Sequence, residues 1–348
     1  MLRLHNLWRA LESIPGATAS GTEWRLRLGD DFESLKSLLL PTDRLATTIP
    51  AANEPYASYR VVRHAADDIV GVHDGDGSTI ALSKLDVLIY RIDLAQLARN
   101  LAAAIGLEPV EVKPSEAPQL IKIGTLRPFA GIEFPAFLTL AVEPADVCHS
   151  LESILLECDS PFIVLSPTAT KLVARCDVLL KRRPTCFVTL TEAVKCDDEG
   201  RWSATAEAVR QLSNFQETVV PQATESNPLV FFPTPSNAVW NHLRIKFVDG
   251  ETVSVKVGDV TGRLLFSQMG MADGRTAKPT KQWELLKEFA RGLGTMTWSS
   301  PGATRKNQKR KELLSDNLKA FFRIDGEPFR PTANGQGWHT IFSVEPDA

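Results

Sequence analysis

The amino-acid sequence predicts an α/β protein, α+β when the whole chain is considered, that is built from more than one domain. Three observations lead to this prediction. The chain has 348 residues, which exceeds the usual size of a single domain. Its hydrophobic content of 43% is typical of folded domains with their own cores. Short runs rich in β-branched residues alternate with segments of helical periodicity along the chain.

Residues 1–106 are predicted to form a β-rich N-terminal region that ends in a helix. This closing helix is expected between Asp93, a good N-cap residue, and Gly106. A shorter helix is expected within residues 32–40. Four short runs separated by turn material predict strands at YRVVRH (59–64), IVGVHDG (69–75), STIALS (78–83) and DVLIYRI (86–92).

Residues 119–214 are predicted to form an α/β domain, and the stretch before it has the composition of a linker. Helices are expected at 146–158 and 168–183, the second of them capped by Thr168 or Thr170. Strands are expected at 119–126, 134–142, 161–167 and 186–190. Short apolar strands that alternate with helices are typical of a parallel sheet covered on both faces.

Residues 215–239 are rich in Pro, Ser and Thr, so they are predicted to be a linker that leads to a third domain at 240–348. The expected order in this domain is two strands joined by a turn at Asp249-Gly250, a third strand, two helices and two closing strands. Thr280 is expected to cap the first helix. The expected ranges are 242–257, 262–270, 278–294, 311–324 and 327–344.

This order of elements, with its closing hairpin, resembles the winged-helix output domain of two-component response regulators of the OmpR/PhoB type. The residues that carry the resemblance are NLKAFF (317–322), similar to the end of the recognition helix, and NGQGWHTIF (334–342), similar to the wing and last strand. The resemblance implies a recognition helix in the DNA major groove and a wing on the backbone or minor groove. The segment 294–307 lacks the apolar repeat of a middle helix, and residues 1–239 show no such resemblance.

The net charge of −3 is unevenly distributed. Residues 240–348 carry 17 Lys and Arg against 12 Asp and Glu, whereas residues 1–239 carry 22 against 30. A regional positive excess favours a polyanionic partner. The run RKNQKRK (305–311) contributes five of the positive charges. A helical wheel places Arg310 and Lys311 beside the apolar face, so the remaining cations gather at the start of the helix, where phosphate is favoured.

The predicted function is that of a non-enzymatic DNA-binding protein, either a transcription regulator or a DNA-recognition subunit, with the α/β region as a sensing or assembly module. Double-stranded DNA is the expected partner, and no cofactor is expected. The candidate DNA-binding residues are Arg305, Lys306, Lys309, Lys319, Arg323, Arg330, Asn334, Gln336 and His339. The alternative is an assembly subunit whose winged helix docks on a protein partner or on a second copy. A plain solvated helix face is the other interpretation of the basic run, because i,i+3 charge pairs decorate any solvated helix.

The candidate catalytic patterns are weak. HDGDG (73–77) is interpreted as a hairpin turn, and the chain has no P-loop, G-x-S-x-G or H-E-x-x-H motif. Five cysteines within 148–196 lack zinc spacing and are expected to be reduced structural thiols. No catalytic or metal-ligating residue is therefore named. A metal-dependent nuclease-like α/β enzyme stays the third possibility, through Asp86, Lys122, Glu133, Glu143 and Asp146.

The sequence also predicts a soluble, cytoplasmic protein with no membrane partner. Its N-terminus lacks the apolar core of a signal peptide, and no window approaches the roughly 20 apolar residues of a membrane span.

Overall fold

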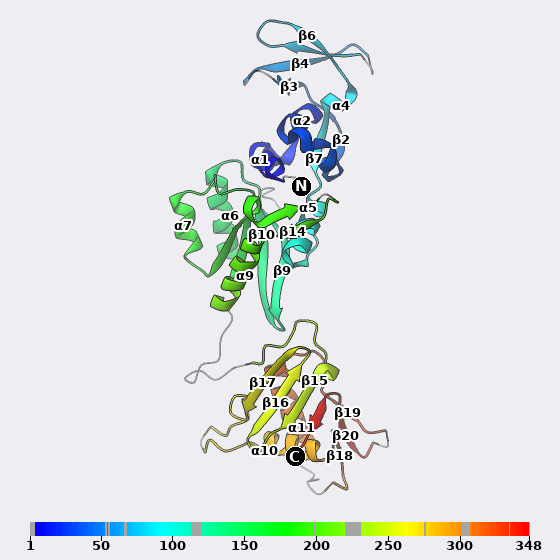
Figure 1. Ribbon diagram of the computed structural model, residues 1–348, viewed down its shortest axis with the longest axis vertical. Helices are drawn as coiled ribbons and strands as arrows, with labels where there is room; N and C mark the ends of the chain where they lie inside the picture. The colour runs from blue at the N-terminus through cyan, green and yellow to red at the C-terminus, as the bar shows by residue number, and fades with distance from the viewer. Residues whose placement is uncertain are drawn as a thin grey trace. The chain divides into compact units, whose positions relative to one another are not determined.

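The computed structural model of the protein describes residues 4–52, 54, 56–65, 68–112, 120–197, 199–219, 231–274, 276–300, 307–333 and 335–347 (Figure 1). The chain divides into two compact units, one formed by Met1–Leu126 with Phe134–Val219 and the other by Arg127–Glu133 with Val220–Ala348. Both contain helices and sheets, which confirms the mixed α/β class. The finer division of residues 1–214 into two domains stays a prediction. In the part of the chain that the structure describes, no helix is long and apolar enough to cross a bilayer.

The N-terminal part of the first unit combines short helices with two antiparallel sheets. One sheet has the order β1-β7-β2 and the other β3-β4-β5-β6. The four predicted strands are confirmed as β4 (Ser58–Arg63), β5 (Ile69–His73), β6 (Thr79–Leu82) and β7 (Leu88–Ile92). The other elements are α1 (His5–Ser13), β1 (Thr18–Ser20), α2 (Gly21–Leu28), β2 (Leu39–Leu45), β3 (Thr48–Pro50) and α4 (Lys84–Val87).

Two predicted helices of this part have different outcomes. The helix after Asp93 is confirmed as α5 (Leu94–Ile105), because the Asp93 carboxylate accepts a hydrogen bond from the Gln96 backbone N–H at 2.9 Å and Gly106 ends the helix at a φ of 79°. The helix expected within 32–40 is only the single turn α3 (Phe32–Leu35). The leucines after it enter β2, which pairs with β7, so sheet pairing overrides the local helix preference.

The second part of the first unit is built on a five-stranded sheet of order β12-β11-β10-β9-β8. The parallel arrangement is confirmed for β10, β11 and β12, whereas β8 and β9 are antiparallel, so the sheet is mixed. The strands are β8 (Glu108–Pro109), β9 (Leu120–Phe129), β10 (Ile132–Thr139), β11 (Phe162–Ser166) and β12 (Thr185–Thr189). Helices α6 (Pro144–Glu157), α7 (Ala174–Leu180), α8 (Leu190–Ala193) and α9 (Ala206–Val219) and the hairpin of β13 (Val194–Cys196) and β14 (Trp202–Ala204) complete this part.

The helix predicted at 168–183 is shortened to α7 because the residues before it have another role. The buried Glu12 carboxylate of α1 accepts hydrogen bonds from the Thr168 N–H at 2.8 Å, the Thr168 hydroxyl at 2.6 Å and the Thr170 hydroxyl at 3.0 Å. Thr168 and Thr170 therefore fasten the loop after β11 to α1 and do not cap a helix. Helix α9 also runs five residues into the segment predicted as a linker, with Phe215 buried.

The five cysteines are free thiols, and four of them are buried. The Cys148 and Cys176 sulfur atoms lie 3.2 Å apart between α6 and α7, within the core of the α/β part. Burial raises the pKa of the Cys148 and Cys186 thiols to about 11, so both are protonated at neutral pH. These thiols act as small apolar groups in the core.

Where the structure describes it, the C-terminal unit contains two sheets and two α-helices. The larger sheet has the order β17-β16-β15-β21, with β21 parallel to β15 and the other neighbours antiparallel. The smaller sheet has the order β18-β20-β19 and is antiparallel. The elements are β15 (Leu243–Phe247), β16 (Thr252–Val257), β17 (Val260–Leu265), α10 (Lys281–Arg291), β18 (Thr295–Thr297), α11 (Asn307–Phe322), β19 (Phe329–Pro331), β20 (Gly337–Thr340) and β21 (Ser343–Glu345).

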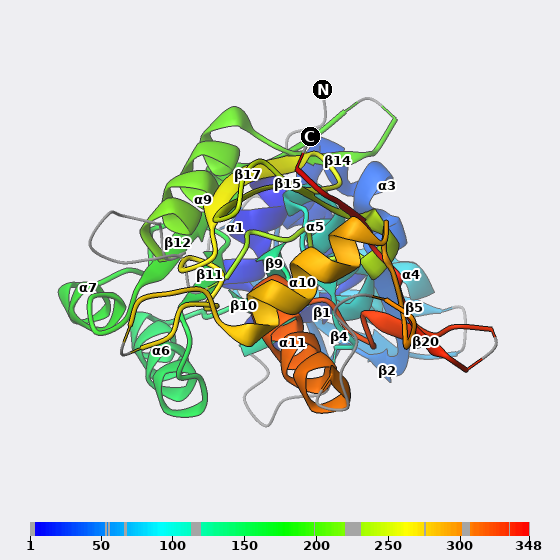
Figure 2. The ribbon, with the colours of Figure 1, turned by 90° about the horizontal axis from the view of Figure 1, so that it is seen from below.

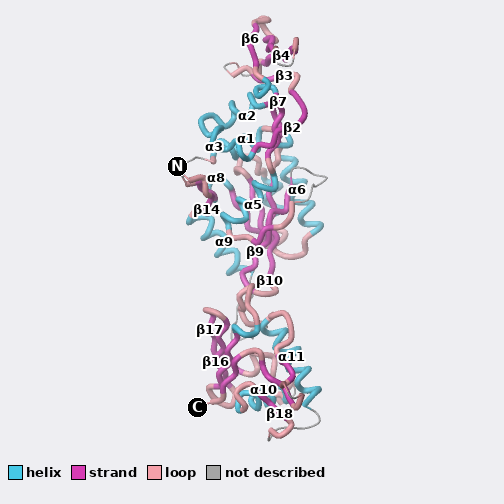
Figure 3. Tube along the Cα trace, turned by 90° about the vertical axis from the view of Figure 1, so that its right-hand side faces the viewer, coloured by secondary structure: helices cyan, strands magenta, loops and turns pink. Residues whose placement is uncertain are grey.

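One core holds this unit together. Alternate residues of β15 and β16 point inward, so Ile245 and Val255 are buried and their neighbours face outward. The buried residues pack on Trp283 and Phe289 of α10, and α10 also contacts α11. Figures 2 and 3 show α10 between the larger sheet and α11. The sheet thus has one face on the core and one open face.

Two local predictions for this unit, a turn and a helix cap, can be compared directly with the structure. The Asp249-Gly250 turn is confirmed between β15 and β16, where the Asp249 carboxylate accepts hydrogen bonds from the Glu251 and Thr252 N–H groups at 2.8 and 2.7 Å. The cap predicted at Thr280 is wrong. Thr280 holds the N-cap position of α10, but its hydroxyl makes no capping bond and has no partner among the described residues.

Candidate nucleic-acid interface

The predicted DNA-binding residues do not form one surface. Arg305, Lys306 and Asn334 lie outside the described residues. The other six fall into three groups, which belong to different parts of the C-terminal unit: Lys319 with Arg323, Lys309 alone, and Arg330, Gln336 and His339 in the smaller sheet.

Lys319 and Arg323 have partners inside the unit. The Lys319 ammonium forms an ion pair with Glu327, and this contact, followed by a hydrogen bond from Ser315 at 3.0 Å, lowers the pKa of Glu327. The Arg323 guanidinium lies 4.0 Å from the centre of the Phe231 ring and donates a hydrogen bond to the Gly131 carbonyl at 3.2 Å. Both cations hold the end of α11 in place, so they contribute little to a surface for an external anion.

Lys309 lies in a group of cations that the structure brings together. It lines a groove of about 680 Å³ with Lys281, at the start of α10, and with Arg310. Arg310 donates a hydrogen bond to the Asn307 side chain at 3.3 Å, and Asp273 also lines the groove. Helix starts favour anions, because their backbone N–H groups and dipole point toward the ligand. We call Lys281, Lys309 and Arg310 the helix groove.

The smaller sheet places Arg330 and His339 side by side. Arg330 of β19 is directly opposite His339 of β20, which is opposite Thr295 of β18. The Thr295 hydroxyl and His339 Nδ1 are 3.0 Å apart, and both Arg330 and His339 are exposed. Gln336 precedes β20, and its backbone carbonyl accepts a hydrogen bond from Trp298 at 3.0 Å. The resemblance to a wing therefore rests on a hairpin that presents one arginine and one histidine.

A further group of cations was missed by the sequence reasoning. Arg244, Lys246, Lys256 and Arg263 are exposed on the open face of the larger sheet, and we call them the sheet face. The signal was present in the alternation of RIKF and SVKV, whose polar residues, three of them basic, occupy every second position. The regional excess of positive charge was instead attributed to α11 and the wing.

Two positively charged side chains face each other across β15 and β16 in the sheet face. Arg244 is directly opposite Lys256, and Lys246 is opposite Ser254, whose other neighbour is Arg263. Side chains directly opposite have Cβ atoms roughly 5 Å apart, and if their charged ends approach as closely, two like charges repel by about 0.8 kcal/mol in water. Within the described residues, the ion pairs of this unit involve none of these four cations. Arg244 and Lys256 thus face each other as like charges, whereas Lys246 is in register with Glu345 and Arg263 lies close enough to Asp249 to affect its pKa.

Acidic groups lie at the margins of the sheet face. Hydrogen bonds from Glu251 and Thr252 lower the pKa of Asp249, and the Arg263 charge lowers it further. Glu345 of β21 is in register with Lys246. A groove of about 760 Å³ at this edge is lined by Arg244, Lys246, Glu345 and His339, so a carboxylate accompanies the cations there.

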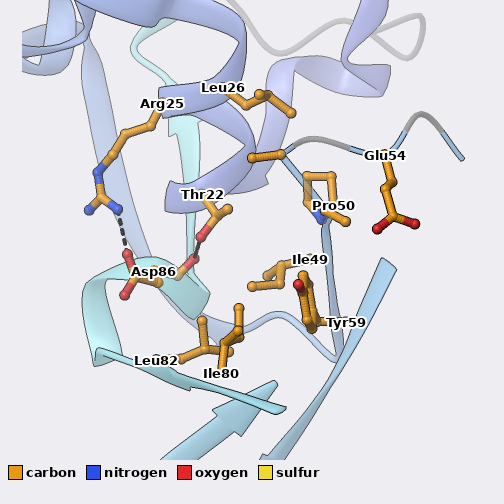
Figure 4. Close-up of a pocket in the computed structure, with 12 residues that line it drawn as sticks. Thr22, Arg25, Leu26, Ile49, Pro50, Glu54, Tyr59, Ile80, Leu82 and Asp86 are labelled. Carbon is orange, nitrogen blue, oxygen red and sulfur yellow. Dashed lines mark hydrogen bonds and ion pairs between the residues drawn. The ribbon is translucent and has the colours of Figure 1, made fainter. Parts of the chain in front are cut away.

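The first unit contains a cavity of about 560 Å³ between α2, β3, β4, β6 and α4 (Figure 4). Arg25 forms an ion pair with Asp86 on one side of it, and Glu54 and Tyr59 lie on the other side. Partial burial raises the pKa of Asp86, but hydrogen bonds from Ser83 and the Arg25 guanidinium lower it by more, so it lies below its ordinary value. This carboxylate therefore stays ionised as a structural partner of α2 and α4.

The carboxylates considered for a nuclease have similar structural roles. Glu133 forms an ion pair with Arg127 at 2.9 Å, and Glu143 and Asp146 form a capping box at the start of α6. Asp86 caps α4 through Ser83. No group of three or more His, Cys, Asp or Glu that could hold a metal ion occurs in the part of the chain covered by the structure.

No protein-family model, no curated protein and no solved structure matches this chain. What the protein binds is therefore inferred from its charged surfaces.

Proposed function

We propose that the protein is a non-enzymatic DNA-binding protein, a transcription regulator or DNA-recognition subunit, whose C-terminal unit contacts duplex DNA. The observation that carries this proposal is the helix groove. Lys281, Lys309 and Arg310 converge there from two helices, and none of them belongs to an ion pair of the described residues. Three cations beside a helix start, against the single carboxylate of Asp273, give the groove a positive excess that favours phosphate groups.

The arrangement around the helix groove agrees with such a role. The strand between the two helices, β18, pairs with the closing hairpin of β19 and β20, so the hairpin is fixed to the helical layer. Contacts from Arg330 on this hairpin would orient the protein on the DNA backbone without reading sequence. Sequence would be read by residues of α11 that reach base edges.

The test is a titration of the full chain onto duplex DNA at several salt concentrations. The variant carries Lys281→Gln, Lys309→Gln and Arg310→Gln. If each cation contacts one phosphate, the slope of log K against log salt decreases by about 2.7, that is about 0.9 per contact.

The matched control removes three exposed cations from the other unit, through Lys181→Gln, Arg182→Gln and Lys195→Gln. The control is expected to keep the slope of the unmodified chain. Absence of binding at low salt, or the same slope in both variants, would contradict the proposal.

A protein partner is the second candidate, and one observation favours it. Trp298 is 48% exposed and lies edge-on to Trp338 at 5.0 Å, and Leu293 is 70% exposed. Aromatic residues with exposed apolar area are enriched at protein interfaces. If this surface joins two copies of the chain, sedimentation will show a dimer that Trp298→Ala converts to a monomer. A monomer before the substitution argues against self-association.

A further inference from the structure

The sheet face has the chemistry of a surface for the phosphate backbone. Its four cations lie on three adjacent strands, with the exposed hydroxyls of Ser254 and Thr261 between them. Arg, Lys, Ser and Thr are the side chains that most often contact phosphate oxygens. Lys246 is two residues from Arg244, roughly 7 Å along the strand, and Arg263 is two strands from Lys246, roughly 10 Å across the sheet. The cations therefore spread over an area and do not converge on one small ion.

The sheet face is suited to double-stranded nucleic acid. Proteins that bind single strands stack the bases on exposed aromatic side chains. The outward residues of β15 and β16 are Arg244, Lys246, Ser254 and Lys256, with Thr252 at the end, and none is aromatic. The outward residues of β17 are Thr261, Arg263 and, at its end, Leu265, which is 44% exposed. A surface of cations and hydroxyls without an exposed aromatic ring is suited to the backbone of a duplex and does not read its sequence.

The sheet face and the helix groove belong to opposite sides of the C-terminal unit. The inner face of the larger sheet packs on α10, and α11 contacts α10 from the other side (Figure 2). The open face of the sheet therefore points away from α11. A single duplex cannot follow both surfaces without bending around the unit.

We propose that the sheet face is a second DNA-binding surface, so that one copy of the protein holds two duplexes together. The inference rests on the proposed function for the first duplex, which the helix groove binds. The second duplex lies across β15, β16 and β17 and is held by Arg244, Lys246, Lys256 and Arg263. Because this contact involves phosphate groups alone, it does not depend on sequence.

The experiment measures bridging by the full chain. One duplex is fixed to beads, a labelled duplex is added in solution, and the captured label is quantified at about 0.1 M salt, where each phosphate contact contributes about eightfold to affinity. The test variant is Arg244→Gln with Lys256→Gln. These two cations face each other, so their removal relieves repulsion and leaves the fold at least as stable. The control is Arg182→Gln with Lys195→Gln.

The proposal expects the test variant to lose about 60-fold in affinity for the second duplex while binding to the first stays within about twofold. The control should bridge like the unmodified chain. A second variant with the helix groove neutralised should lose the first duplex and retain binding through the sheet face.

Other outcomes overturn the inference. If the chain binds one duplex but never bridges, or if the test variant bridges normally, the sheet face is not a DNA surface, and the proposed function is unaffected. If the test variant loses all binding and the helix-groove variant loses none, the protein has one DNA surface and the role given to the helix groove fails. If polyglutamate binds the sheet face more tightly than a duplex, the partner is an acidic protein. If the chain binds no duplex at all, the proposed function fails with it.

Discussion

Replacement of Arg244 by glutamate should stabilise the C-terminal unit. In the unmodified chain Arg244 is directly opposite Lys256, and two like charges that approach to roughly 5 Å repel by about 0.8 kcal/mol in water, which is the upper bound for this exposed pair. Arg244→Glu converts this repulsion into an attraction of similar size, so the greatest possible gain is about 1.6 kcal/mol. Both side chains are exposed, and exposed pairs contribute less than the Coulomb value because of solvent and side-chain entropy. We therefore expect a gain of about 0.5 to 1 kcal/mol in the free energy of unfolding.

The assay is urea unfolding of the full chain, followed by hydrogen exchange of peptides from β16 so that the C-terminal unit is measured separately. Arg244→Gln serves as the matched variant, because it removes the repulsion without adding an attraction, and it should show about half the gain. At about 1 M salt, where the Debye length is about 3 Å, the gain of both variants should largely disappear.

A variant that already carries Lys256→Ala tests whether Lys256 is the residue with which position 244 interacts. With Lys256→Ala in place, Arg244→Glu should no longer stabilise the unit, because the opposing charge is absent. An equal gain in that background, or a gain that does not depend on salt, would refute the electrostatic explanation of the sheet face.

Three further predictions concern the first unit. Glu12→Ala should lower the free energy of unfolding by about 3 kcal/mol in urea titrations, because it leaves the buried Thr168 N–H without its acceptor and removes the hydrogen bonds of the Thr168 and Thr170 hydroxyls to the carboxylate; a loss below about 1 kcal/mol would contradict the role of this carboxylate. Asp86→Asn should destabilise the unit at pH 7, and the destabilisation should decrease as the pH falls below the unfolded value of the Asp86 pKa. The pKa of Asp86 is lower in the folded chain than in the unfolded chain. Its contribution to the free energy of unfolding is therefore fully present above the unfolded pKa of about 3.9 and is lost as the pH falls through the folded pKa. A difference in unfolding free energy between the two proteins that is constant with pH would argue against this. Under native conditions iodoacetamide should label the partly exposed Cys158 much faster than Cys148, whose thiol is buried and has a pKa of about 11, and equal rates would contradict the buried position.

Local patterns predicted the elements whose stability comes from local contacts. The strands β15 and β16 follow from strict alternation on either side of an Asp-Gly turn, and α5 follows from a cap at Asp93 and a terminal glycine. Helix α2 was missed because Trp24, Leu26 and Leu28 alternate with arginines, which is the period of a strand. In the structure Trp24 and Leu28 are buried and Leu26 is 43% exposed, which is the spacing of a helix.

The candidate site could be predicted only in part, because its geometry depends on contacts between segments that are far apart in the sequence. The positive charge of the C-terminal region was visible in the composition, and Lys309 does lie in a groove with other cations. The partners of Lys319 and Arg323 depend on how distant segments meet, and Gly131 is 192 residues from Arg323. The sequence does not show that Arg244 and Lys256 face each other, because this depends on the register of β15 and β16.

The contact between Glu12 and the loop after β11 has a consequence for the α/β part of the chain. Open α/β sheets bind their ligands in the crevice outside the carboxyl ends of the strands, and Thr168 lies just beyond the carboxyl end of β11. There the backbone N–H and hydroxyl groups that would receive an anionic ligand already hold a carboxylate from the first helix of the same chain. A carboxylate of the chain itself therefore occupies the position where an external anion would bind, and it joins the end of β11 to α1.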